Sequence, residues 1–192
     1  MKLIGLVVSV FILIGCKNPK SQIPKPKMYF RIDLPQLHHY KSLETSCPYT
    51  FEYPIYAGID STSLSKTATN CWKDVVITPA NARIHLTYKS VNNNLDTYIE
   101  DVHTMAYKHD VKADNIEPLF IENADAKVYG LFYNISGNAA SPYQFFLTDS
   151  NQHFIRGAVY INARSNRDSL SPLIEFVNKD LQHLIQTFHW KK

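Results

Sequence analysis

The stretch Ala82-Arg83-Ile84-His85-Leu86-Thr87-Tyr88-Lys89 alternates between apolar and polar side chains. Ile84, Leu86 and Tyr88 fall on one side of an extended chain, and the polar residues between them fall on the other. Because successive side chains of a strand point to opposite faces, this pattern predicts a strand with one face in a hydrophobic core. Half-buried strands of this kind are typical of antiparallel sheets.

Further strand candidates surround this stretch. Three turn segments separate several of them: Pro79-Ala80-Asn81, Gly137 to Pro142, and Asp149-Ser150-Asn151-Gln152. The polar run from Ser61 to Asn70 predicts a surface loop. Short connections favour antiparallel pairing of neighbouring strands. The predicted strands are Tyr49 to Tyr53, Lys73 to Thr78, and residues 116–122, 127–136, 143–149 and 153–162.

Two segments have helical periodicity. Residues 94–109 repeat apolar side chains every three or four positions after Asn92-Asn93-Asn94, which supplies N-cap chemistry. The segment Asp168 to His189 has a continuous apolar face that includes Phe188, and Pro172 fits a first turn. The element order predicts an α+β fold, an antiparallel sheet packed by two amphipathic helices, and is similar to that of PsbP/Mog1-like domains.

The N-terminus has the layout of an export signal. Lys2 is followed by an apolar run that is too short to span a bilayer and ends at Gly15. Leu13-Ile14-Gly15-Cys16 resembles the bacterial lipobox, which implies cleavage before Cys16 and lipid attachment to its thiol. Two or three acyl chains would hold such a protein firmly to a membrane. The alternative is an ordinary signal peptide that happens to contain a cysteine.

These features predict three parts: a signal peptide over residues 1–15, a lipidated tether with an extended arm over residues 16–45, and one globular domain over residues 46–192. The arm, Met28 to Pro35, alternates between apolar and polar residues and ends at a proline. It is either an edge segment of the same domain or a partner-binding arm. Loops and arms often carry recognition residues. The candidate partner-binding residues are Tyr29, Phe30, Arg31 and Asp33 in the arm, and Asn138 and Ser141 in the turn.

Cys47 and Cys71 remain for the globular domain. An exported protein reaches a compartment where disulfides form, so the two residues are a candidate pair. Cys71 also precedes Trp72 and an apolar run, an environment that suits a buried free thiol as well. The sequence is compatible with both interpretations, a Cys47–Cys71 disulfide and a free thiol at Cys71.

Several function classes find no support in the sequence. The formal net charge is +3 without a long run of one sign, so we expect no nucleic-acid partner. The eight histidines show no metal-binding spacing, and phosphate loops and hydrolase elbows do not occur. We therefore expect no catalytic residues, no metal and no cofactor.

An ordered set of segments resembles the gliding-motility lipoprotein GldD family of the Bacteroidetes. The resemblance implies a role in the gliding apparatus and in the type IX machinery that exports its adhesins. Only Cys16 can be carried over as a position of known chemistry. The segments are Tyr29-Phe30-Arg31-Ile32-Asp33-Leu34-Pro35, Phe51-Glu52-Tyr53-Pro54, Cys71-Trp72, Ile84-His85-Leu86-Thr87-Tyr88, Tyr107-Lys108-His109, Gly137-Asn138-Ala139-Ala140-Ser141 and Phe154-Ile155-Arg156-Gly157-Ala158-Val159-Tyr160.

The main hypothesis is a non-enzymatic accessory lipoprotein, bound to a membrane by its N-terminal lipid and to protein components of the gliding and secretion machinery. The alternative is a small-ligand or lipid-binding module, suggested by the many Tyr and Phe residues. Lys17-Asn18-Pro19-Lys20 lacks the acidic cluster that resembles a surface-export signal in this phylum. We therefore expect the domain to face the periplasm, at the outer rather than the inner membrane.

Overall fold

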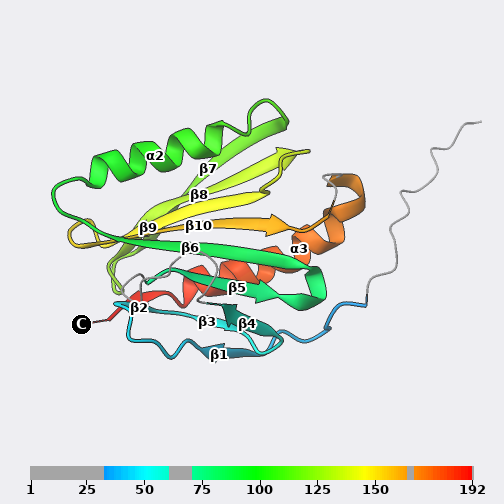
Figure 1. The fold of residues 1–192 in the computed structure, drawn as a ribbon, viewed down its shortest axis with the longest axis horizontal. Helices are drawn as coiled ribbons and strands as arrows, with labels where there is room; N and C mark the ends of the chain where they lie inside the picture. The colour runs from blue at the N-terminus through cyan, green and yellow to red at the C-terminus, as the bar shows by residue number, and fades with distance from the viewer. Residues whose placement is uncertain (1–32, 61–70, 164–166, 192) are drawn as a thin grey trace, which may run out of the picture.

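The computed structural model describes residues 33–60, 71–163 and 167–191. Its centre is a seven-stranded antiparallel sheet with the strand order β4-β5-β6-β10-β9-β8-β7 (Figure 1). In the described residues the sheet is accompanied by two α-helices, α2 (Leu95–Tyr107) and α3 (Arg167–Gln186), and by two small two-stranded ladders. The seven strands are β4 (Ala57–Asp60), β5 (Lys73–Ile77), β6 (Ala82–Ser90), β7 (Ala113–Asn123), β8 (Val128–Gly137), β9 (Tyr143–Thr148) and β10 (His153–Ile161).

The alternating stretch of the sequence is β6, near the middle of this sheet. It pairs with β5 on one side and with β10 on the other. Ile84 and Leu86 are buried, whereas Arg83, His85 and Thr87 are only half-buried. The predicted half-buried antiparallel strand is confirmed, and the other predicted strands of this sheet match the structure to within a few residues.

The sheet has a helix on each face. Phe145 and Phe146 are neighbours in β9 and point to opposite sides. Phe145 belongs to a large core with α3, and Phe146 belongs to a smaller core with α2. The predicted α+β class, with an antiparallel sheet packed by two helices, is confirmed, and the layers follow the order helix, sheet, helix.

The N-terminal segment packs against α3. β3 (Glu52–Pro54) pairs with β1 (Tyr40–Ser42) and lies beside the helix (Figure 1). Asp180 of α3 is buried, and its carboxylate accepts hydrogen bonds from the hydroxyl groups of Tyr56, at 2.8 and 2.9 Å, and of Tyr40, at 3.2 Å. Burial, followed by the charge of Asp180, raises the pKa of Tyr40 to about 12. Helix α3 is therefore enclosed on more than one side.

The packed part of the chain begins upstream of residue 46, the boundary expected from the sequence. β1 is paired, and Leu43 is buried in the core, because this segment closes over α3. Residues 28–32 of the predicted arm lie outside the described residues, as does the predicted loop over residues 61–70. Asp33 to Pro35 form no strand, and Leu34 packs against the core.

Two local predictions in the first half of the chain need correction. The predicted strand over residues 49–53 is divided at Phe51 into β2 (Tyr49–Thr50) and β3, because its two parts pair with different strands. Asn94 occupies the N-cap of α2, but its side-chain oxygen accepts the backbone N–H of Asn92 at 2.8 Å instead of a helix amide. Neighbouring turn geometry therefore outcompetes capping.

The C-terminal helix is shorter than predicted. It ends at Gln186, and Phe188 is buried beyond its end, because His189–Trp190 form a strand, β11, that pairs with β2. Pro172 lies inside α3 rather than in its first turn. The apolar periodicity runs through the boundary because both the helix and the residues after it face one core.

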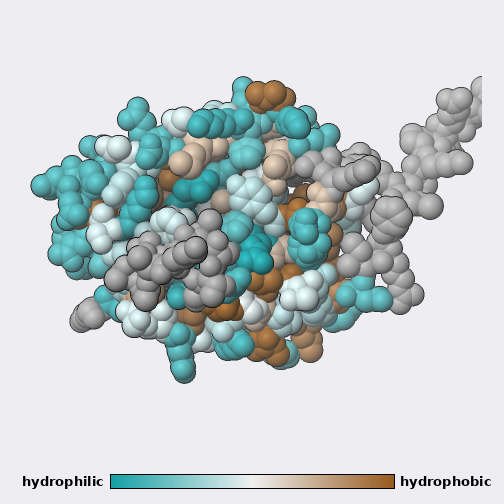
Figure 2. Space-filling view, in the orientation of Figure 1, coloured by the Kyte–Doolittle hydropathy of each residue, from teal (hydrophilic) through white to brown (hydrophobic). Residues whose placement is uncertain are grey.

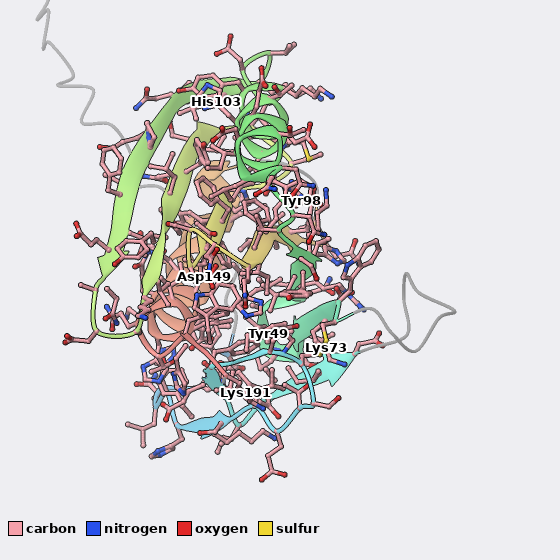
Figure 3. The ribbon with its side chains drawn as sticks, turned by 90° about the vertical axis from the view of Figure 1, so that its left-hand side faces the viewer. Tyr49, Lys73, Tyr98, His103, Asp149 and Lys191 are labelled. Atoms are coloured by element: carbon pink, nitrogen blue, oxygen red, sulfur yellow. A yellow bond between two sulfur atoms is a disulfide. The ribbon has the colours of Figure 1, made fainter. Side chains whose placement is uncertain are left out.

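Cys47 and Cys71 form a disulfide, with Cα atoms 5.5 Å apart. It joins the N-terminal segment to the residues just before β5, and Figure 3 shows it near Lys73. The hydroxyl of Tyr49 donates to the carbonyl of Cys71 at 2.8 Å. The bridged alternative is the one that the structure contains.

Candidate functional site

The sequence singled out two groups of candidate residues. Cys16, Tyr29, Phe30 and Arg31 lie outside the described residues, so their roles stay predictions. Asp33 is described and exposed. The structure does not bring the described candidates into one site: Asp33 precedes the segment beside α3, and Asn138 and Ser141 lie in the turn between β8 and β9.

Ser141 is not available to a partner, which corrects its assignment as a binding residue. Its side chain is fully buried, and its hydroxyl donates to the carbonyl of Tyr143 at 3.1 Å. Asn138 is exposed, and its backbone N–H donates to the carbonyl of Lys112 at 3.0 Å. Gly137 has a φ of +93°, and a Cβ there would lie 2.5 Å from the amide nitrogen of Asp114. The turn is therefore built mainly for tight packing of the chain.

A polar cluster lies on the sheet face that also carries α2, over β5, β6 and β10. The buried carboxylate of Asp74 accepts a hydrogen bond from Arg83 Nη1 at 3.0 Å and contacts His85 Nδ1 at 2.8 Å. The same Arg83 nitrogen lies 3.2 Å from a carboxylate oxygen of Asp60. These hydrogen bonds, led by the one to Asp74, raise the pKa of Arg83. Asp74 thus holds the side chains of Arg83 and His85 together on this face of the sheet.

A half-open hollow of about 500 Å³ lies beside this cluster. It is bounded by the ends of β5, β6 and β10 and by Ala140 of the β8–β9 turn. Its lining is mixed: Asn81 and Asn162 are joined by a hydrogen bond of 2.8 Å, and the Tyr160 ring lies 5.4 Å from that of His85. A deep apolar cavity is the usual form of a lipid or cofactor site, and this hollow differs from it.

The second candidate site is the outer edge of the sheet. β7 is the last strand in the order, and Figure 3 shows it along one side of the sheet with β8 beside it. Phe120 is 91 % exposed and Leu119 is 46 % exposed. Val111, in the loop before β7, is also 91 % exposed but lies outside the strand, and Figure 2 shows hydrophobic surface over this loop. A long edge strand with exposed large apolar residues is a typical pairing or docking surface.

Sequence reasoning missed this edge, although a signal was present. Leu119-Phe120-Ile121 interrupts the alternation expected for a strand with one solvent-facing side. Pro118 lies inside the same strand, and proline within a strand indicates an edge position. The two signals together favour an edge position for this strand, although they do not show which residues stay uncovered.

An aromatic residue of α2, Tyr107, packs on β8, the strand next to β7. Pro118 lies opposite Tyr133 of β8 in the ladder. The ring of Tyr133 packs edge-on against Tyr107 of α2 at 6.5 Å, and His103 lies 4.4 Å from Tyr107, ring to ring. Tyr107 is itself partly exposed. The end of α2 thus carries a partly exposed aromatic ring that packs on the strand next to β7.

Two further features, a metal cluster and a membrane-spanning helix, concern residues 33–60, 71–163 and 167–191. Within these ranges, no group of three or more His, Cys, Asp or Glu side chains could hold a metal ion. In the same ranges no helix is long and apolar enough to cross a bilayer.

The family model for the gliding motility lipoprotein GldD matches residues 19–190. The chain belongs to the GldD family. The match covers nearly all of the described structure, including both candidate sites. A search of curated proteins gave no match. The resemblance seen in the sequence is confirmed.

Membership of the GldD family makes the chain a gliding-motility lipoprotein of the cell envelope. The matched residues begin after Cys16, so lipid attachment at this position continues to rest on Leu13-Ile14-Gly15-Cys16. The family name identifies no binding residue. The choice between the polar hollow and the β7 edge therefore rests on geometry.

Proposed function

We propose that this GldD-family lipoprotein is a non-enzymatic accessory component of gliding motility and type IX secretion. It is anchored by lipid on Cys16, faces the periplasm, and is located at the outer rather than the inner membrane. It acts by binding a protein component of the machinery. The lipobox, the absence of an acidic cluster after Cys16 and the family support this proposal.

The observation that carries the proposal is the exposed edge strand β7. Phe120 projects almost fully into solvent from a strand of eleven residues, in a domain whose other aromatic rings are mostly packed. Exposing a phenyl ring costs hydrophobic free energy unless a partner covers it. Aromatic residues at such positions often contribute a large share of the binding energy of an interface.

The test compares two apolar residues of equal exposure. Phe120→Asp should reduce secretion of a type IX cargo, and colony spreading where the bacterium glides, by at least about tenfold. Val111→Asp, at a site with the same exposed fraction but in the preceding loop, is the matched control and should leave both at wild-type level. Immunoblots of membrane fractions should show equal amounts of both variants. Normal secretion with Phe120→Asp would show that secretion does not depend on partner binding at β7.

The anchor has its own test. Cys16→Ser should abolish labelling by a metabolic fatty acid and release the protein from the membrane fraction, since two or more acyl chains are needed for stable anchoring. Equal recovery of wild type and variant in membranes, with neither labelled, would contradict lipidation at Cys16.

Sidedness is measured separately. Protease added to intact cells should spare the protein, and opening the outer membrane should expose it. Degradation in intact cells would instead place the domain on the cell surface.

The predicted arm remains a second candidate contact. Phe30→Ala with Arg31→Ala should impair secretion without lowering the amount of folded protein, if the arm binds a partner. A parallel loss of thermal stability would assign Phe30 to packing on its own domain, at a cost of about 3 kcal/mol for a buried phenylalanine.

The alternative function, a small-ligand or lipid-binding module, is supported by the hollow beside Asp74, His85 and Tyr160. If ligand binding there were the function, His85→Ala and Tyr160→Ala should abolish secretion while Phe120→Asp leaves it intact. We expect the opposite pattern, because the hollow is open and three of its polar side chains, those of Asn81, Arg83 and His85, already have partners within the domain.

A further inference from the structure

The outward direction of the β7 backbone follows from its neighbour β8. The N–H of Ile135 in β8 donates to the carbonyl of Pro142 at 2.9 Å, on the β9 side. Residues of an antiparallel strand direct their backbone groups alternately to one side and the other. The backbone groups of residues 132 and 134 in β8 are therefore directed toward β7, where the ladder partners of these two residues are Leu119 and Glu117.

The residues of β7 that alternate with these direct their backbone groups away from β8, toward the open edge of the sheet. Counting alternately from Glu117 and Leu119, these are Ile116, Pro118, Phe120 and Glu122. Pro118 has no N–H, so it falls where a missing donor costs no bond within the sheet. Phe120 and Glu122 follow it with free N–H groups, and within the described ranges no strand pairs with this edge.

We propose that β7 binds an extended strand of a partner protein by adding it to the sheet, and that this strand carries both apolar and basic side chains. The inference rests on the proposed function and specifies its mode of binding. Main-chain hydrogen bonds to Phe120 and Glu122 supply affinity, and side-chain contacts to Phe120 supply part of the specificity.

The charge of β7 selects the partner. Asp114, Glu117 and Glu122 are exposed, and the strand contains no lysine or arginine. Opposite charges on facing strands stabilise pairing, whereas like charges oppose it. A basic strand therefore complements β7. A second copy of the same strand does not, because it would bring carboxylates against carboxylates.

The test uses the full-length lipoprotein in detergent micelles and two synthetic ten-residue peptides, one alternating Lys with Val and one alternating Glu with Val. The Lys peptide should slow amide hydrogen exchange at Phe120 and Glu122 by at least about tenfold, and the Glu peptide should have no such effect. The Lys peptide methylated on alternate backbone nitrogens keeps its side chains but loses the pairing donors, and it should not protect these amides.

Matched variants separate the backbone from the charge. Glu122→Pro removes an outward N–H, as Pro118 already does in this strand, and should weaken peptide binding by about tenfold or more. Glu122→Gln keeps the N–H and should weaken binding by only about two- to fivefold. Unchanged binding by Glu122→Pro, equal binding of the methylated peptide, or no protection of β7 amides would each overturn strand addition. Protection that rises with protein concentration without peptide would overturn it in favour of self-pairing.

Secretion assays distinguish failure of this inference from failure of the proposed function. Loss of secretion with Phe120→Asp but not with Glu122→Pro would leave docking at β7 intact and reject strand addition. Loss with both variants supports strand addition. Normal secretion with both would reject the proposed function of this edge as well as the inference.

Discussion

The two faces of the sheet are packed very differently. The face with α3 shares one continuous core with the helix, the N-terminal segment and the residues after α3, including Phe51, Phe145 and Phe188. The face with α2 has a small core: Val102, Ala106, Tyr133, Ile135, Phe146 and Phe154. Helix α2 covers only β9, β10 and their neighbours, so β7 and the polar cluster around Asp74 stay open on this side. The comparison indicates that stability depends mainly on the α3 face, and that both candidate sites lie on or beside the less covered α2 face.

Adjacent residues of β9 give the sharpest test of this difference and the largest expected effect. Phe145→Ala should lower the free energy of unfolding by about 4 kcal/mol, and Phe146→Ala by about 3 kcal/mol. Phe145 lies in the larger core, which cannot collapse around a cavity, whereas α2 can settle toward the sheet after Phe146 is truncated. Urea unfolding of a soluble form that begins at residue 18 measures both values. A larger loss for Phe146→Ala would reverse the comparison.

The disulfide belongs to the same strongly packed side. Cys47→Ser with Cys71→Ser should cost about 3 kcal/mol, because the bridge closes a loop of 24 residues in sequence separation and restricts the unfolded chain. Thermal melting with and without reductant checks this, and reductant should not affect the double variant. An unchanged melting temperature would show that the N-terminal segment is held by packing alone.

Asp180 tests the polar part of the α3 face. Asp180→Asn should destabilise the domain by about 2 kcal/mol, since hydrogen bonds to a charged acceptor are stronger than neutral ones. Because the pKa of Tyr40 is raised in the folded state, the protonated hydroxyl of this residue contributes to the free energy of unfolding. This contribution is fully present below about pH 10 and is lost as the pH rises toward about 12. The variant should lower this pKa toward 10 without reaching it, because burial is the larger cause. The Tyr40 ring signal in an NMR titration would contradict this if its midpoint did not move.

The β9–β10 turn depends on neither face and gives the smallest effect. Asp149 accepts the backbone N–H groups of Asn151, Gln152 and His153 at 2.8 to 3.0 Å. Burial alone would raise the Asp149 pKa, but these three bonds lower it overall. A lowered pKa stabilises the fold above the unfolded-state pKa of about 4, and this contribution is lost as the pH falls through the folded-state value.

Asp149→Ala should therefore cost about 1 kcal/mol at pH 7, and the difference from wild type should shrink below about pH 4. Urea unfolding across this pH range measures it. A difference that stays constant with pH would show that the carboxylate charge does not hold the turn.

Much of the fold could be predicted because local patterns and tertiary packing agree. The alternation in β6, the turn at Asp149 and the periodicity of α2 each follow from side chains within one short segment. The predictions that failed depended on distant partners. The end of α3 was placed too late because Phe188 continues the apolar pattern after the helix has ended. Phe188 is buried there because β11, which follows it, pairs with β2.

The candidate site was the harder part. Ser141 lies in a turn whose composition is typical of a binding loop, but its hydroxyl donates inward to the carbonyl of Tyr143. No sequence pattern reveals this direction. Phe120 looks like another core residue of a strand, and only the strand order shows that no element covers it within the described chain. Whether an apolar side chain is buried depends on what lies across from it.

The sequence by itself predicted an export signal with a lipobox, and it was enough to recognise the helix and strand periods and the family, because each of these patterns is carried by contiguous residues. The tertiary structure alone decided which cysteine alternative is realised, which strand forms the free edge, and that Asp74 holds Arg83 and His85 together. These features join residues far apart in the chain, and their free energy comes from contacts that exist only once the sheet has formed its strand order.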